Sequence, residues 1–299
     1  MKNKLEENNF IEVERVTKNY QDPYSGVYFQ ALNGVDLRIK QGTLSSIVGP
    51  SGAGKSTLLN ILGGMIKPST GKVTIDGLPI QSLTQADLNN YRRHICGFLW
   101  QESERNLMSG LSVEQNILYA MRISGYPREK RKMRIETLLK SFGIWERRHH
   151  KVNQISGGEA ARASLSVALA NEPKLLLADE PTGELDSETT LEIIDYLKKI
   201  NQEEGITIVV VTHDKRFENS TDRSYNILDG TLAGMRKTIN ADENRDWRTV
   251  KREEVVVVNS LGQIQIPQLL RDRFNIKNFA KLIIDEENNR MYLESADEE

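Results

Sequence analysis

Cysteines, long apolar runs and an excess of either charge are scarce or missing in this sequence of 299 residues. A single cysteine, Cys96, rules out a disulfide within the chain and therefore a disulfide scaffold. Apolar runs such as Val255–Val258 fall far below the roughly 18 residues that a membrane-spanning helix needs. The first residues lack the apolar core of a signal peptide. We therefore expect a chain that stays in the reducing cytoplasm and reaches a membrane only through a partner.

The charge of the chain is close to balanced. Its 40 Lys and Arg residues against 42 Asp and Glu residues give a formal net charge of −2. A general nucleic-acid binder usually carries a basic excess, so this balance argues against nucleic acid as a partner. With 38% hydrophobic and 27% charged residues, the composition is typical of a folded globular protein. The length suits one large domain or two ordinary ones.

Apolar periodicity predicts an α/β fold. Several short segments either alternate apolar with polar residues or are continuously apolar, as half-buried and buried strands do. A helix at about residues 187–201 separates the last two of them, and strand, helix, strand in this order predicts a parallel sheet. The strands expected from these patterns are residues 11–16, 35–39, 44–48, 73–75, 175–178 and 206–211.

Changes in composition divide the chain into parts. Residues of about 86–165 are rich in Arg, Lys, Glu and Leu at helical spacing, which predicts a mostly helical subdomain inside an α/β core of residues 8–236. Residues 237–254 are dense in charge and are expected to form a linker. Residues 255–296 are apolar and strand-like again, so we expect a small second domain that is rich in β-structure.

One glycine-rich motif carries a specific chemistry. Gly49–Ser56 fits the phosphate-loop pattern G-x-x-x-x-G-K-[ST] in full, with an apolar strand before it and a helix after it. Backbone N–H groups of such a loop and the helix N-terminus attract phosphate. Lys55 is expected to contact the β- and γ-phosphates, and the Ser56 hydroxyl is expected to bind Mg²⁺. The alternative is an ordinary glycine-rich turn.

Two carboxylates end a strongly apolar strand. Leu175–Ala178 leads directly into Asp179 and Glu180, and buried charge is costly unless it has a partner or a task. Beside a phosphate loop, Asp179 suits the Mg²⁺ shell and Glu180 suits the polarisation of an attacking water. The alternative is a pair of solvated acids that begins a loop.

A second anion cradle precedes an alanine-rich helix. In Ser156–Glu159, the serine can cap the helix and the two glycines leave backbone N–H groups free. One nucleotide has a single triphosphate, so the economical explanation is that this cradle serves the nucleotide of a neighbouring subunit. The alternative is an ordinary helix cap.

The order and spacing of these motifs resemble those of ABC-type ATPase domains over residues of about 8–235. The motifs that carry the resemblance are the phosphate loop at 49–56, Gln101 after Gly97–Trp100, Ser156–Glu159, Leu175–Glu180, Gly183–Asp186 and Val211–Asp214.

The resemblance implies a role for each matching residue. Glu180, His213 and Gln101 are expected to act in catalysis, and Ser56, Gln101 and Asp179 are expected to hold Mg²⁺. Asp186 would connect the two sites of a head-to-tail dimer, in which the signature motif acts in trans on the partner's γ-phosphate. That motif consists of Ser156, Gly157, Gly158 and Glu159. The expected ATP-binding residues are Tyr20, Gly49, Ser51, Gly52, Ala53, Gly54, Lys55, Ser56 and Thr57.

Two of these assignments have competing interpretations. Tyr20 is expected to stack on the adenine, but Tyr24, Tyr28 and Phe29 are alternative candidates for this role. His213 also has an alternative, which is a capping or buried histidine with no contact to phosphate.

Within the family, Asn106-Leu107 and Leu111–Asn116 resemble the lipoprotein-exporter and macrolide-exporter branch. This resemblance implies an ATP-hydrolysing subunit with ATP and Mg²⁺ as cofactors. It also implies a homodimer or pseudo-symmetric dimer that is bound to an integral membrane permease at the inner face of the membrane. The alternative is an ATP-responsive regulator, or a non-transport ABC ATPase, with a DNA-binding C-terminal module.

The C-terminal residues resemble another family. Around Leu261–Pro267 the pattern is similar to the swapped-hairpin domain of AbrB-like regulators, which is an obligate dimer and often binds DNA. The physical argument agrees with a dimer, since about 40 residues rarely bury enough surface alone. Gln263 stands where those regulators usually have Arg, and acids outnumber bases over residues 253–299, which argues against DNA binding. The alternative is a β-module that packs on its own ATPase domain.

Overall fold

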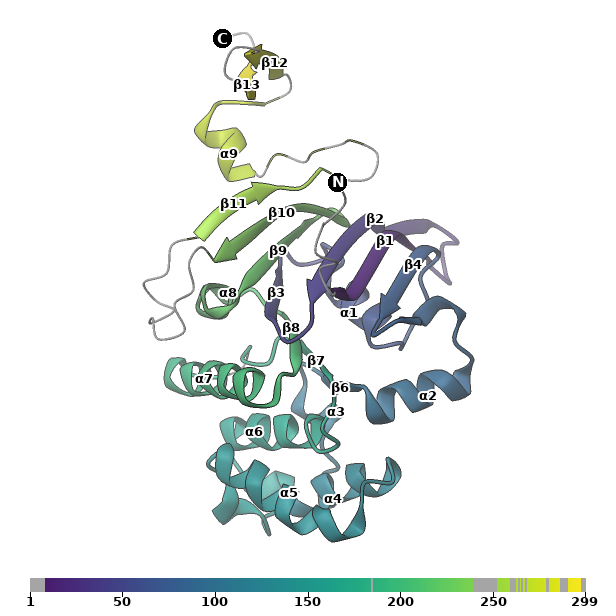
Figure 1. Cartoon of the computed structure of the whole chain (residues 1–299), viewed down its shortest axis with the longest axis vertical. Helices are drawn as coiled ribbons and strands as arrows, with labels where there is room; N and C mark the ends of the chain where they lie inside the picture. The colour runs from purple at the N-terminus through teal and green to yellow at the C-terminus, as the bar shows by residue number, and fades with distance from the viewer. Residues whose placement is uncertain are drawn as a thin grey trace, which may run out of the picture.

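Two β-sheets and the helices around them make up the body of the chain (Figure 1). The computed structural model describes residues 9–183, 185–238, 252–258, 262, 264, 266, 268–277, 280–285 and 290–296. Among these residues, no helix combines the length and the apolar character needed to cross a bilayer.

The smaller sheet is antiparallel and contains four strands. Alternation places Ile11, Val13 and Val16 in the core, which confirms the strand predicted at residues 11–16. The predicted strands at 35–39 and 73–75 also belong to this sheet. Its strands, in spatial order, are β2 (Tyr28–Lys40), β1 (Asn9–Gln21), β4 (Thr70–Ile75) and β5 (Leu78–Pro79).

The larger sheet contains seven strands and is mixed. In spatial order the strands are β11 (Arg252–Val256), β10 (Thr231–Thr238), β9 (Arg223–Leu228), β3 (Leu44–Val48), β8 (Thr207–Val211), β7 (Leu175–Asp179) and β6 (Cys96–Leu99). Five neighbouring strands, from β9 to β6, run parallel, as the strand–helix–strand order predicted (Figure 1). At the other end of the sheet, β10 pairs in antiparallel register with β9 and with β11.

Both faces of the central strands are buried. In β7, Leu175 and Leu177 pack in the cluster that includes the antiparallel sheet, whereas Leu176 and Ala178 pack in the cluster with the helical region. A strand that is covered on both faces has a continuous apolar sequence rather than an alternating one. This explains why β7 and β8 have nearly continuous apolar sequences.

Helices cover both faces of the larger sheet, and α4, α5 and α6 gather at its far end (Figure 1). The α-helices of the body are α1 (Lys55–Leu62), α2 (Gln85–His94), α3 (Ser103–Asn106), α4 (Val113–Ile123), α5 (Arg128–Ser141), α6 (Gly157–Ala168), α7 (Ser187–Glu204) and α8 (Lys215–Ser220). Short 3₁₀ turns occur at η1 (Ile80–Ser82), η2 (Trp145–Arg147) and η3 (Val152–Gln154).

The region expected to be mostly helical, residues 86–165, also contains strand β6. This strand has four residues, too few for a period to stand out in the sequence. It is fixed by tertiary contacts, because it pairs with β7 and its Gly97 lies against the end of α6. A Cβ atom on Gly97 would lie 2.3 Å from the carbonyl oxygen of Ala168. The helical subdomain is therefore interrupted by one strand of the core sheet.

Strand β11 crosses the boundary expected between linker and second domain. It begins at Arg252, inside the predicted linker of residues 237–254, and pairs in antiparallel register with β10, with Gly234 opposite Val256. Without it, β10 would be an open edge of the sheet. The apolar run Val255–Val258 thus lies partly in a strand that begins at Arg252 and adds to the core sheet. Linker residues 239–251 lie outside the described residues.

The remaining described C-terminal elements are a helix and a two-stranded hairpin. A bridge between Val258 and Ile264 comes first, and the elements after it lie beyond β11 in Figure 1. They are α9 (Gln268–Arg273), β12 (Ala280–Asp285) and β13 (Arg290–Ser295), with β12 and β13 antiparallel. Several residues that carry the AbrB-like resemblance, among them Leu261, Gln263 and Pro267, lie outside the described residues, as do residues 1–8.

Candidate active site

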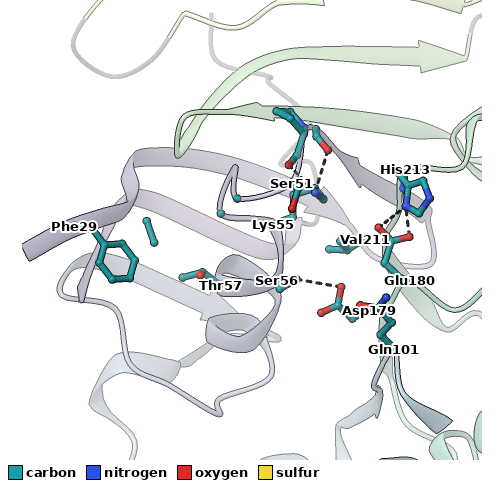
Figure 2. A pocket seen from close by; sticks show the side chains of 15 residues that line it. Phe29, Ser51, Lys55, Ser56, Thr57, Gln101, Asp179, Glu180, Val211 and His213 are labelled. Carbon is teal, nitrogen blue, oxygen red and sulfur yellow. Dashed lines mark hydrogen bonds and ion pairs between the residues drawn. The ribbon is translucent and has the colours of Figure 1, made fainter. Parts of the chain in front are cut away.

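A cavity of 630 Å³ opens where β3, β7 and β8 end, at the carboxyl edge of the parallel strands. In Figure 2, Phe29 lies at one end of this cavity and Glu180, His213 and Gln101 lie at the other. The cavity is lined by Phe29, Ala31, Gly49, Pro50, Ser51, Gly52, Gly54, Lys55, Ser56, Thr57, Gln101, Asp179, Glu180, Val211 and His213.

The phosphate loop wraps between β3 and α1 in a conformation that requires glycine. Gly49 and Gly54 have φ angles of 149° and 99°. A Cβ atom would lie 2.1 Å from the carbonyl oxygen of Ile227 at Gly49, and 2.3 Å from that of Ala31 at Gly54. The Lys55 ammonium donates to the carbonyl oxygens of Gly49 and Pro50 at 3.0 and 2.9 Å. The loop thus holds its lysine along its own backbone, at the cavity wall.

Ser56 and Asp179 meet at the middle of the cavity. The Ser56 hydroxyl donates to Asp179 Oδ1 at 3.2 Å, although the two residues come from different elements. Burial, together with the nearby Glu180 charge, raises the pKa of Asp179 against the opposing effects of Ser56 and Lys55. A hydroxyl and a carboxylate oxygen, with Gln101 lining the same cavity, are hard oxygen donors that suit Mg²⁺. The residues present therefore fit this ion.

Glu180 and His213 form a hydrogen-bonded pair at the end of the cavity opposite Phe29 (Figure 2). His213 Nδ1 lies 2.9 Å from Glu180 Oε1, and the side chain of Glu180 is only 12% exposed against 74% for His213. Glu180 adopts a φ of 48°, in the left-handed region that a residue other than glycine rarely occupies. Its N–H still donates to the Val211 carbonyl at 2.9 Å. The left-handed backbone of Glu180 therefore ends the extended conformation of β7 and redirects the side chain. The hydrogen bond to β8 fixes the position of the Glu180 backbone.

Gln101 follows β6 and lies in a segment closed by an asparagine side chain. Asn106 Oδ1 accepts from the Trp100 N–H at 2.9 Å, and Asn106 Nδ2 donates to the carbonyl oxygens of Trp100 and Glu102 at 2.8 and 3.1 Å. Gln101 and Glu180 also line a smaller cavity of 80 Å³, together with Gly157. These two side chains therefore lie between the large cavity and the first turn of α6.

The signature motif caps helix α6. The Ser156 hydroxyl accepts from the Glu159 N–H at 3.2 Å, and Glu159 Oε2 accepts from the Ser156 N–H at 2.9 Å. The Ser156 N–H bond and the Arg147 side chain lower the pKa of Glu159. Ser156 and Gly157 are exposed, and neither lines the large cavity of its own chain. A capping hydroxyl that accepts one bond can still donate another, so the cap leaves the predicted role in trans open.

Asp186 also has a local structural role. It is the N-cap of α7, where Oδ1 accepts from the N–H groups of Glu188 and Thr189 at 2.9 Å each. These backbone bonds and the Thr189 hydroxyl lower the pKa of Asp186. The predicted coupling role of Asp186 in a dimer stays a prediction. Glu184 of the same motif lies outside the described residues.

The structure separates two of the predicted ATP-binding residues from the cavity. Ala53 is 3% exposed and packs beneath the loop rather than lining the cavity. Tyr20 does not line the cavity, whereas Phe29, one of its competitors in the sequence, does. Sequence analysis also missed Ala31 and Val211 as lining residues. Val211 could have been found as the last residue of an apolar parallel strand.

Comparisons with known proteins agree with this geometry. A family model described as ABC transporter matches residues 32–183. The lipoprotein-releasing system ATP-binding protein LolD of Syntrophus aciditrophicus is 39% identical over 222 residues, which cover 74% of this chain and 98% of that protein. The uncharacterized ABC transporter ATP-binding protein MJ0796 of Methanocaldococcus jannaschii is 40% identical over 238 residues, with 78% and 99% covered.

Solved structures give the same result. The chain matches a dimeric, post-hydrolysis structure of the MJ0796 ATP-binding cassette bound to ADP and phosphate, with a TM-score of 0.70 and 38% identity. The match covers 76% of this chain and 98% of that one. A second dimeric structure of this cassette matches with a TM-score of 0.71. These matches favour a transporter subunit over the DNA-binding regulator and the non-transport ATPase. The chain belongs to the ABC transporter ATP-binding family and is an ATP-hydrolysing subunit of that family.

Proposed function

We propose that this chain powers an exporter-type ABC transporter, with two copies that enclose two ATP molecules in a head-to-tail dimer. The observation that carries the proposal is the single cavity in which phosphate loop, Asp179, Glu180, His213 and Gln101 meet. The resemblance of Asn106-Leu107 and Leu111–Asn116 to the lipoprotein- and macrolide-exporter branch supports the export direction.

The residues at the catalytic end support hydrolysis by an activated water. Glu180 accepts the proton of the attacking water, and His213 orients the Glu180 carboxylate through the 2.9 Å contact and faces the γ-phosphate. Ser56, Asp179 and Gln101 would hold Mg²⁺, which neutralises charge on the phosphate oxygens when it is bound. Lys55 leaves its carbonyl partners to contact phosphate, so catalysis depends mainly on position and charge.

The location of the signature motif supports a site shared between two subunits. Ser156–Glu159 sits at an exposed helix N-terminus, and none of its residues lines the large cavity of its own chain. Backbone N–H groups at a helix N-terminus bind phosphate oxygens well. In the proposed dimer, this terminus closes the partner's cavity over the γ-phosphate, and Asp186 relays the state of one site to the other.

A membrane partner supplies the transport path. The described residues contain no helix that could span a bilayer. The relatives reported above are named as ATP-binding proteins of a lipoprotein-releasing system and of an ABC transporter. We infer that the chain is located at the inner face of the cell membrane, where it binds an integral permease. The permease selects the transported substrate.

For the C-terminal residues we propose an AbrB-like, swapped-hairpin dimerisation domain. The order of α9, β12 and β13 agrees with that fold, and the hairpin has an apolar, exposed face. A tail that holds two chains together raises the local concentration of one ATPase domain near the other between hydrolysis cycles.

The shared site is tested by subunit mixing. Ser156→Arg places a bulky cation at the proposed interface. In a chain that lacks the proposed C-terminal dimerisation domain, this substitution should block ATP-driven dimerisation, while each subunit still binds ATP. The Ser156→Arg chain is then mixed with a Glu180→Gln chain, whose signature motif is intact. The mixture should form dimers with at most one composite site each. The measurement is light scattering with Mg²⁺ and ATP, with nucleotide binding followed by calorimetry.

The control for this experiment is Ser103→Arg, which introduces the same side chain outside the signature motif. Unfolding of Ser156→Arg, seen as loss of the cooperative melting transition, would show that the serine acts only as a helix cap. Undiminished dimerisation would reject the shared site.

A further inference from the structure

A carboxylate lies at the helix end that carries the signature motif. Glu159 is the third residue of α6, and its side chain is 19% exposed. Its N–H and its Oε2 both bond to Ser156, which closes the capping box. The N–H groups of Gly157 and Gly158 take no part in this box and, at the start of a helix, have no acceptor within it. The groups proposed to bind phosphate therefore lie within one helical turn of a negative charge.

This charge opposes the binding of phosphate. The bond from the Ser156 N–H and then the Arg147 side chain lower the pKa of Glu159, so the carboxylate is ionised at neutral pH. Like charges that meet at an interface reduce the affinity between its two sides. In the proposed dimer, the triphosphate of the partner's nucleotide meets this helix end. A cation beside Glu159 removes the opposing charge.

Arg147 supplies that cation. Its Nε donates to Glu159 Oε1 at 2.8 Å, while Glu159 Oε2 accepts from the Ser156 N–H at 2.9 Å. Both carboxylate oxygens therefore have a partner, and the two bonds fix the orientation of the carboxylate. Arg147 belongs to η2 and not to α6. The net charge at the N-terminus of α6 is thus set by a tertiary contact.

The residues next to Arg147 have other partners. Arg147 opens a run of five Arg, His and Lys residues. The guanidinium carbon of Arg148 lies 4.3 Å from the centroid of the Trp145 ring, and Arg148 Nη1 donates to the Trp145 carbonyl at 3.1 Å. His149 Nδ1 lies 3.4 Å from Glu114 Oε2 on α4. Of the ion pairs described for this run, that of Arg147 reaches the signature motif and that of His149 does not.

We propose that Arg147 is a positioning residue of the shared ATP site, which holds Glu159 and offsets its charge so that the N-terminus of α6 can receive the partner's γ-phosphate. The inference rests on the proposed action of the signature motif in trans and adds a residue to it. Arg147 contacts Glu159 and not the nucleotide. Its contribution is therefore needed only while residue 159 carries a negative charge.

A double-substitution cycle tests this dependence on charge. Phosphate release by the full chain over a range of Mg-ATP concentrations gives kcat and KM. Arg147→Gln should lower kcat/KM about tenfold, because it leaves the Glu159 charge without its cation. Glu159→Gln keeps an oxygen that can accept from the Ser156 N–H, but it removes the charge. On this background, Arg147→Gln should change kcat/KM by less than about twofold.

ADP provides a second readout. It has no γ-phosphate, so its binding depends on the phosphate loop of the same chain and not on the signature motif of the partner. Calorimetry should therefore give an ADP affinity for Arg147→Gln within about twofold of that of the unsubstituted chain. Arg147→Lys, which keeps the positive charge, should recover most of the kcat/KM that Arg147→Gln loses.

The matched control is the neighbouring arginine. Arg148→Gln removes the same charge from a side chain that contacts Trp145 instead of Glu159, so kcat/KM should stay within about twofold of the unsubstituted chain. Ser156→Arg in the same assay tests the shared site itself and should abolish turnover.

Each outcome decides the inference. Unchanged kcat/KM in Arg147→Gln overturns it. An equal loss on both backgrounds also overturns it, because Arg147 would then support the fold and not offset the Glu159 charge. A loss of the same size in Arg148→Gln would point to general surface charge and has the same consequence. Full turnover in Ser156→Arg would reject the shared site, which is a different failure from that of Arg147 alone.

Discussion

The ATPase body and the C-terminal hairpin differ in how far their apolar side chains are buried. In the body, the parallel strands β7 and β8 are buried on both faces and carry almost only Leu, Ile, Val and Ala. In the hairpin, Leu282, Ile284 and Met291 are 52%, 66% and 67% exposed. The body therefore buries its own apolar side chains, whereas the described residues of the hairpin leave apolar surface exposed.

Three exposed apolar side chains of the hairpin, Leu282, Ile284 and Met291, share one face. Leu282 pairs with Leu293, and Ile284 pairs with Met291 across the two strands, so the four side chains form a continuous apolar patch. A two-stranded hairpin is at best marginally stable alone in water. The contrast teaches that the nucleotide cavity is built within the body, whereas the task that we propose for the C-terminal residues is assembly.

The largest expected effect lies in the body. Glu180→Gln keeps the size of the side chain but removes the charge that accepts a proton from water. We expect ATP binding to persist and steady-state turnover to fall by about a hundredfold or more. Phosphate release measures turnover, and Glu188→Gln, at an exposed position on α7, is the control. Equal turnover in Glu180→Gln and the unsubstituted chain would contradict the assignment.

The next effect concerns the phosphate loop. Lys55→Ala removes a charge-assisted contact to phosphate that is worth about 2–3 kcal/mol. ATP affinity, measured by calorimetry, should therefore fall by tens of fold. Lys72→Ala, at an exposed position on β4, should bind ATP as the unsubstituted chain does. If Lys55→Ala retained full affinity, the loop would not be a phosphate site.

The third prediction sharpens the contrast from the side of the hairpin. Ile284→Lys places a charge in the apolar patch, and loss of a buried isoleucine contact costs about 1.5–3 kcal/mol. We expect the dissociation constant of the nucleotide-free dimer to rise about tenfold or more over that of the unsubstituted chain, as seen by light scattering over a dilution series. Lys281→Ala, on the other face of β12, should leave the dimer intact. A full-length chain that is monomeric without ATP would refute tail dimerisation.

The smallest effect returns to the body. Because burial and the Glu180 charge raise the pKa of Asp179 above its ordinary value of 3.8, its ionised form destabilises the folded chain at pH 7. Asp179→Asn should therefore raise the melting temperature of the ligand-free chain by a few degrees at most, about 1 kcal/mol. This gain should vanish as the pH falls below 3.8, where the native carboxyl is protonated in both states. A lower melting temperature at pH 7 would contradict the argument.

Local motifs made the phosphate loop and the two carboxylates that line the cavity predictable. The loop Gly49–Ser56 is one contiguous stretch of sequence, and Asp179 and Glu180 are neighbours in another. The chemistry of each motif requires these residue types at these spacings. The parallel strands were predictable as well, because burial on both faces leaves an unbroken apolar run. The sequence could not separate Phe29 from Tyr20, since both are aromatic residues on neighbouring strands of the same sheet.

The sequence by itself determined the α/β class, the phosphate loop and the two acids at the end of β7, because each depends on residues close together in the chain. Only the tertiary structure decided that Cys96–Leu99 becomes a core strand and that Arg252–Val256 extends the sheet beside β10. It alone also decided that Phe29 rather than Tyr20 lines the cavity. These three outcomes depend on the partner that a short segment finds across the fold, and neither the period nor the composition of a segment encodes that partner.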